Sequence, residues 1–192
     1  VLMRMGLPYD SDQARAVAQG LTAILTGEAY ATSADLAREL GPFEYYAENR
    51  DAMLRVIRNH HHAAHGQSEG YEGLSVLPRP LSTALCPAVL AEAARNSWET
   101  ALRKGSVSGF RNAQVTVLAP TGTIGLVMDC DTTGVEPDFS LVKYKTLAGG
   151  GTMKLINESV PLALRTLGYP ATAADSMTRY IVGTGTLQNC TT

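Results

Sequence analysis

A glycine between two threonines follows an apolar stretch in the middle of the chain, and this pattern is well suited to binding an anion. Residues 113–118 alternate β-branched and polar side chains, which predicts a strand that Pro120 would end. Gly122 lets the backbone approach a ligand closely, and the hydroxyls of Thr121 and Thr123 lie beside N–H groups that could meet phosphate oxygens. We therefore predict a phosphate-binding turn, although a purely structural turn fits the local chemistry equally well.

Four histidines lie close together at residues 60–65, and His61 and His65 have the four-residue spacing that places two metal ligands on one face of a helix. The sequence shows no glutamate between them to act as a base and indicates no third ligand. Basic side chains also favour the last turn of a helix because they interact well with its dipole. We therefore predict that this segment holds no metal.

Two other segments have compositions that suggest ligand binding but lack the required spacing. The glycines at residues 149–151 are not accompanied by the lysine and the serine or threonine of a nucleotide P-loop, so they predict a tight bend after a strand. Four acidic residues within residues 129–138 do not follow the alternating spacing of a calcium loop, so capping or solvent exposure is expected. These four residues are Asp129, Asp131, Glu136 and Asp138.

The cysteines and the overall composition exclude several classes of protein. Cys86, Cys130 and Cys190 are far apart and form no Cys-x-x-Cys pair, which argues against a zinc site or a disulfide framework. Cys130 follows the glycine turn closely and is expected to be a buried, unreactive thiol. With 45% hydrophobic residues and a net charge of −2, the chain lacks the basic excess of a nucleic-acid-binding protein. It also lacks an apolar run of about 18 residues that could span a membrane.

Hydrophobic periodicity predicts a helix-rich first part followed by mixed structure. Helices are expected at about residues 10–27, 28–40 and 49–66, the first two separated at Gly27. Pro87 begins a further helix that should end near Gly105. A strand at residues 141–147 and a helix at residues 157–167 follow the central strand. This alternation of helices and strands indicates an α/β fold.

The longer sequence around the glycine turn resembles the adenosylcobalamin-dependent, or class II, ribonucleotide reductases. The resemblance extends in the same order over residues 1–185. The strings that carry it are Met5-Gly-Leu-Pro-Tyr-Asp-Ser-Asp12, Thr26-Gly-Glu-Ala-Tyr30, Pro78-Arg-Pro-Leu81, Gly109-Phe-Arg-Asn112, Leu118-Ala-Pro-Thr-Gly-Thr-Ile124, Asp129-Cys-Asp-Thr-Thr-Gly-Val-Glu-Pro-Asp138 and Leu141-Val-Lys-Tyr-Lys145.

This resemblance implies that residues 1–185 are part of the ten-stranded α/β barrel of these reductases, truncated at both ends, with a helix-rich N-terminal part. Residues 186–192 remain an unassigned tail. The three separated cysteines indicate reduced thiols and a cytoplasmic location. The resemblance implies a much longer enzyme, compatible with a homodimer, that reduces ribonucleotides to deoxyribonucleotides by a thiyl-radical mechanism. Adenosylcobalamin would be its radical source, and a thioredoxin-like protein its reductant.

Within this family, the matching residues form the loop that holds the phosphates of the substrate. The residues so assigned are Pro120, Thr121, Gly122, Thr123 and Ile124. No catalytic residue and no metal ligand is assigned to the segment, so it should be inactive alone. The alternative is a non-redox module of α/β fold that binds phosphate or nucleotide, because the same turn would serve both.

Overall fold

The computed structural model describes residues 1–138 and 140–191, which form two compact units. One unit combines Val1–Ser11 with Leu118–Thr192, and the other is Asp12–Val117. Thr192, the last residue of the expected tail, lies outside the described residues. No helix among the described residues is both long enough and apolar enough to cross a membrane. Each unit has its own buried core, so each is described separately below.

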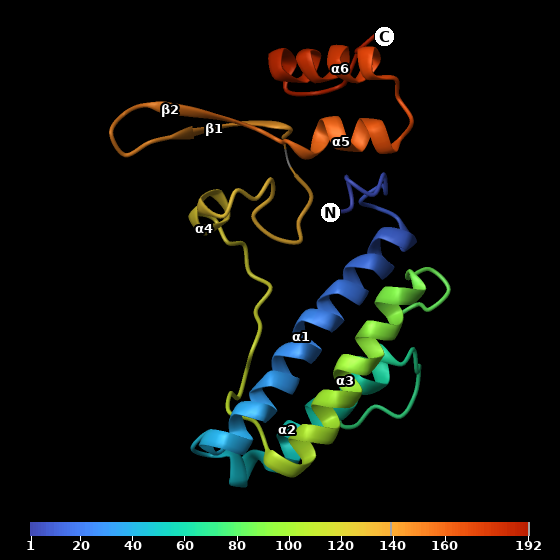
Figure 1. The fold of residues 1–192 in the computed structure, drawn as a ribbon, viewed down its shortest axis with the longest axis vertical. Coiled ribbons are helices and arrows are strands. Elements are labelled where there is room, and N and C mark those ends of the chain that lie inside the picture. The colour runs from blue at the N-terminus through green and yellow to red at the C-terminus, as the bar shows by residue number, and fades with distance from the viewer. Residues whose placement is uncertain (139, 192) are drawn as a thin grey trace. The chain divides into compact units, whose positions relative to one another are not determined.

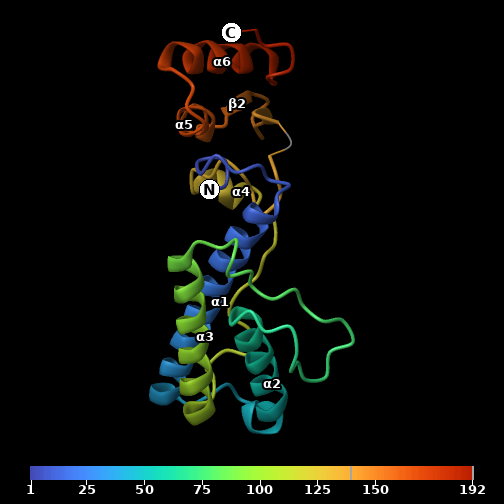
Figure 2. The ribbon, with the colours of Figure 1, turned by 90° about the vertical axis from the view of Figure 1, so that its right-hand side faces the viewer.

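The Asp12–Val117 unit consists of three packed helices, α1 (Asp12–Leu40), α2 (Tyr46–Ala64) and α3 (Ala88–Ser108) (Figures 1 and 2). Aromatic rings fill its core, where Tyr30 lies 5.6 Å from Phe110 and 6.0 Å from Trp98 between ring centroids. Trp98 and Phe110 are almost completely buried. Such edge and tilted ring contacts add to the large apolar area that aromatic side chains bury.

The expected break between two helices at Gly27 is wrong, because α1 runs through this residue without interruption. A Cβ atom on Gly27 would overlap the side chain of Ser97 on α3, so the glycine permits close helix packing and does not end a helix. Gly105 has the same role inside α3, where the ring of Phe110 covers it. The α3 helix therefore continues to Ser108, three residues beyond the expected end.

The helix predicted at residues 49–66 is confirmed as α2, although it begins earlier, at Tyr46. Asn49 lies in its first turn, where the Asn49 amide donates to the carbonyl of Tyr45 at 2.9 Å. The irregular segment that follows α2 is attached to it by a reciprocal pair of hydrogen bonds. Asn59 Oδ1 accepts from the Glu72 N–H at 2.8 Å, and Asn59 Nδ2 donates to the Glu72 carbonyl at 3.0 Å.

The strand predicted at residues 113–118 is not present in the described structure. The segment is irregular, and side chains attach it to α1: Asn112 contacts Ser33, and Thr26 Oγ1 lies 3.0 Å from Thr116 Oγ1. A strand requires a neighbour that accepts its backbone hydrogen bonds, and no described segment pairs with residues 113–118. Residues 113–118 therefore have the alternating sequence of a strand, but no described segment forms a sheet with them.

The other unit contains α4 (Thr123–Val127), an antiparallel pair formed by β1 (Val142–Thr146) and β2 (Thr152–Ile156), and the helices α5 (Ser159–Thr166) and α6 (Ala171–Thr184) (Figure 1). The register pairs Val142 with Ile156 and Thr146 with Thr152. The bend expected at residues 149–151 is confirmed as the connection between the strands, and Gly150 has a φ of +85° there. The core of this unit is built from Val142, Val160, Leu164, Ala174, Met177 and Ile181.

The strand predicted at residues 141–147 and the helix predicted at 157–167 are confirmed as β1 and α5. Pro161 lies in the first turn of α5 and does not interrupt it, because the first N–H groups of a helix have no intrahelical partner to lose. The sequence analysis did not predict α4, β2 or α6.

Candidate phosphate-binding site

The glycine turn is held in place through Thr121. The Thr121 N–H donates to the Thr133 carbonyl at 2.5 Å, and Thr121 Oγ1 donates to the same carbonyl at 3.1 Å. The Ile124 N–H donates back to the Thr121 carbonyl at 3.1 Å. One of the N–H groups expected to meet a ligand is therefore used inside the protein, and Thr121 fixes the turn.

The next two residues leave their donors available. Gly122 and Thr123 are exposed, and among the described residues neither backbone N–H donates to a backbone carbonyl. Gly122 has a φ of +55°, which L side chains rarely adopt, and a Cβ atom there would have no protein atom within 4 Å. Pro120 and Ile124 are also exposed. The exposed turn thus has two backbone N–H groups that no backbone carbonyl of the described residues uses, and a threonine hydroxyl beside them.

Lys145 on β1 adds a positive charge to this turn. Its Nζ lies 3.4 Å from Thr123 Oγ1, although the two residues are 22 positions apart in the sequence. An ammonium group is a good partner for a phosphate oxygen because the hydrogen bond is assisted by charge. Sequence reasoning missed Lys145 as a site residue. The alternation of apolar and basic residues in 141–147 predicts that Lys145 and Lys143 lie on the same face of a strand. It does not indicate that this face lies next to the glycine turn.

The acidic residues after the turn have structural roles. Asp131 Oδ1 accepts the N–H of Glu158 at 2.9 Å, and its other oxygen accepts from the hydroxyl of Ser159 at the start of α5. Asp131 thus attaches to the residues where α5 begins without capping the helix, while Asp129 and Glu136 are exposed as expected. Asp138 differs, because it is buried and forms an ion pair with Lys143 at 2.8 Å.

The expectation that Cys130 is buried is wrong. The chain turns at Asp129, which has a φ of +55°, and leaves Cys130 exposed on the surface just after α4. It lines a hollow of about 280 Å³ together with Asp131, Lys143, Lys154 and other residues. Cys86 is the buried thiol of this chain, and burial raises its pKa.

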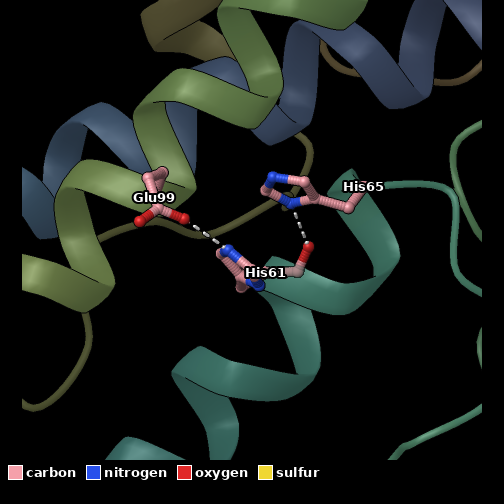
Figure 3. Close-up of side chains that lie close together, drawn as sticks. All are labelled: His61, His65 and Glu99. Carbon is pink, nitrogen blue, oxygen red and sulfur yellow. Dashed lines mark hydrogen bonds and ion pairs between the residues drawn. The ribbon is translucent and has the colours of Figure 1, made fainter.

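The histidine segment has an acidic neighbour that the sequence did not indicate. Glu99 on α3 faces α2, and its Oε2 lies 2.7 Å from His61 Nε2 (Figure 3). Together with His65 it completes a group of three side chains whose ligand atoms lie within 4.8 Å of one another. The expectation that no third ligand accompanies the two histidines is therefore corrected.

Comparison with known proteins places this chain in a family. The family described as "Ribonucleotide reductase, barrel domain" matches residues 1–191. A vitamin B12-dependent ribonucleotide reductase of Agrobacterium fabrum is 61% identical over 188 residues, which cover 97% of this chain and 15% of that protein. Proteins of the same name from Bradyrhizobium diazoefficiens and Rhodopirellula baltica are 59% and 50% identical, each over 98% of this chain. The chain thus spans about 15% of the length of the first two relatives.

Proposed function

This chain belongs to the ribonucleotide reductase family as part of its barrel domain, and from that premise we propose that it holds the phosphates of the substrate in a vitamin B12-dependent ribonucleotide reductase. The complete enzyme would reduce ribonucleotides to deoxyribonucleotides in the cytoplasm. It would accept electrons from a thioredoxin-like protein and could act as a homodimer. The segment contributes binding and orientation, and no residue of it takes part in the radical step.

The observation that carries this proposal is the exposed turn with Lys145 beside it. The N–H groups of Gly122 and Thr123, the Thr123 hydroxyl and the Lys145 ammonium are all donors, which suits a ligand that has only acceptor oxygens. Thr121 holds the turn through Thr133, so that these donors keep their places before the ligand arrives. A substrate fixed in this way at its phosphates has its ribose held at a constant distance from the turn.

Adenosylcobalamin would supply the radical chemistry of the complete enzyme. The described residues of the turn do not fit this cofactor, because they are exposed and do not line the hollow of about 280 Å³ beside Cys130, which is itself smaller than a site for a drug-sized ligand. They suit a phosphate group instead. We therefore derive no step of this chain through the cofactor.

Substitutions in the turn of the complete enzyme test the proposal. Gly122→Val, Lys145→Met and the double change Thr121→Ala with Thr123→Ala should each weaken substrate binding by about 1–3 kcal/mol, the scale of lost hydrogen bonds to a charged group. Equilibrium binding of the nucleotide and of cobalamin would be measured separately. Cobalamin binding should change much less.

Thr172→Ala is a matched control, because Thr172 is an exposed threonine on α6. It should leave both binding constants unchanged. If the turn variants bound nucleotide as tightly as the parent enzyme, the phosphate-binding role would be wrong. Lys145→Met should also reduce the dependence of nucleotide binding on salt, because one charge pair is lost.

A further inference from the structure

His61 of α2, His65 directly after the end of α2, and a glutamate of α3 form a compact group on the helical unit, separate from the glycine turn. His61 lies in the last turn of α2 and His65 is its C-cap residue, four positions later, and the carboxylate of Glu99 faces them from α3 (Figure 3). One ligand atom from each lies within 4.8 Å of the other two. In a tetrahedral zinc site, metal–nitrogen bonds of about 2.0–2.1 Å place neighbouring ligand atoms about 3.3 Å apart. Small side-chain movements would therefore bring these three atoms to that spacing.

The hydrogen bond of His65 leaves the correct ring nitrogen available for a metal. His65 Nδ1 lies 2.8 Å from the carbonyl oxygen of His61. A carbonyl oxygen only accepts, so Nδ1 carries the hydrogen in the neutral ring, and Nε2 has the lone pair that a metal needs. A backbone carbonyl bonded to the remote nitrogen is also the arrangement that commonly orients a histidine ligand.

Packing on either side holds the two helices at this point. The ring of His60 stacks on Trp98, with centroids 4.7 Å apart and planes inclined by 20°, and Trp98 directly precedes Glu99. Ile57, one turn before His61, is completely buried. The histidine pair and the glutamate therefore come from two helices that the core already fixes side by side, while 60% exposure of the Glu99 side chain leaves its carboxylate able to adjust.

We propose that His61, His65 and Glu99 bind a divalent transition-metal ion of the zinc class, with water in the fourth position, and that the ion joins α2 to α3. Two imidazoles and one carboxylate suit zinc and similar ions, whereas calcium and magnesium prefer sites made of oxygen atoms alone. This inference does not rest on the proposed phosphate-binding role, since it concerns different residues. Without a metal, the described contacts of these side chains include the hydrogen bond between His61 and Glu99 and that of His65 Nδ1 to the His61 carbonyl.

The test measures Zn²⁺ bound to the complete protein that contains this chain, prepared without cobalamin and freed of metal by a chelator. After dialysis against Zn²⁺, the parent protein should hold one more equivalent per chain than the variant with His61→Gln and His65→Gln. Glu99→Gln should weaken this one site at least tenfold while leaving the fold intact, because the side chain is mostly exposed. Co²⁺ in place of Zn²⁺ should give the visible absorption of a tetrahedral ion in the parent protein but not in the variant with His61→Gln and His65→Gln.

A matched control keeps the result specific. Glu92→Gln changes an exposed glutamate of the same helix as Glu99 that lies outside the group. It should keep the additional equivalent of Zn²⁺. Equal Zn²⁺ content and affinity in the parent protein and in the His61, His65 and Glu99 variants would overturn the proposal and leave a plain hydrogen bond between His61 and Glu99.

Discussion

Lys143 Nζ lies 2.8 Å from Asp138 Oδ1, and the Asp138 side chain is only 4% exposed. The second carboxylate oxygen of Asp138 accepts from Asn157 Nδ2 at 2.6 Å. One buried carboxylate thus joins β1 to the segment that leads into α5. Because Lys145 lies two residues further along β1, this ion pair also fixes the strand that presents Lys145 to the glycine turn.

Asp138→Asn should destabilise the complete protein by about 3 kcal/mol, because it removes the carboxylate charge that lies 2.8 Å from the mostly buried Lys143 ammonium. This loss of stability is at the lower end of the usual range for breaking a buried ion pair, since Lys143 keeps a hydrogen bond to the Asp131 carbonyl. Denaturant unfolding would measure the loss. Asp175→Asn, at an exposed position of α6, should change stability by less than about 0.5 kcal/mol. Equal losses in the two variants would show that the ion pair contributes nothing specific.

Gly27→Ala should destabilise the helical unit by about 1–3 kcal/mol, because the added methyl group overlaps Ser97 where α1 and α3 pack. Gly183→Ala is the matched change inside α6, where a Cβ atom meets nothing within 4 Å. It should be neutral or stabilise by up to about 1 kcal/mol, since alanine is the better helix former. Thermal unfolding of both variants would compare them, and equal effects would contradict the packing role of Gly27.

Local patterns in the sequence predicted the elements whose cause is local. The alternation in 141–147 and the apolar spacing in 157–167 are confirmed as β1 and α5. Gly27 was misread because its conformation is ordinary helix, and the reason for a glycine there is Ser97, on another helix. Residues 113–118 have the composition of a strand, but no described segment supplies the hydrogen-bonding partner that a strand needs.

The same distinction applies to the two candidate sites. A glycine turn with threonines is visible as a contiguous string, and the prediction that it binds phosphate stands as a proposal. Lys145 and Glu99 were missed because each reaches its site from a distant part of the sequence, 22 residues from Thr123 and 38 residues from His61. Only the packing of β1 near the turn, and of α3 against α2, brings these charges into place.

Acid should weaken the attachment of the loop after α2 through Glu72. Hydrogen bonds from Arg58 lower the pKa of the Glu72 carboxyl below its usual value of 4.5. A carboxyl group with a lowered folded-state pKa stabilises the fold above its unfolded pKa, and this contribution is lost as the pH falls through the folded value. The difference in melting temperature between the parent protein and Glu72→Gln should therefore be largest near neutral pH and should shrink below pH 4.5.

Glu69→Gln is the control for this titration, because Glu69 is an exposed glutamate in the same loop. Its melting temperature should follow that of the parent protein at every pH. A difference between the parent protein and Glu72→Gln that stays constant from neutral pH to pH 3 would contradict the assignment, because a protonated Glu72 can no longer pair with Arg58.

The 192-residue chain expressed alone should associate in solution, because apolar side chains that a barrel would cover are exposed around the glycine turn. Val117, Ile124, Val127 and Met128 are 67% to 81% exposed, and the two-stranded sheet of β1 and β2 is too small to be stable without further packing. Light scattering and binding of a hydrophobic dye would measure this association. The aromatic core around Trp98 should meanwhile preserve the helical circular dichroism signal.

Replacing Val127 and Met128 by lysine should reduce dye binding. A monodisperse monomer with one sharp unfolding transition would instead show that the chain is a self-sufficient domain.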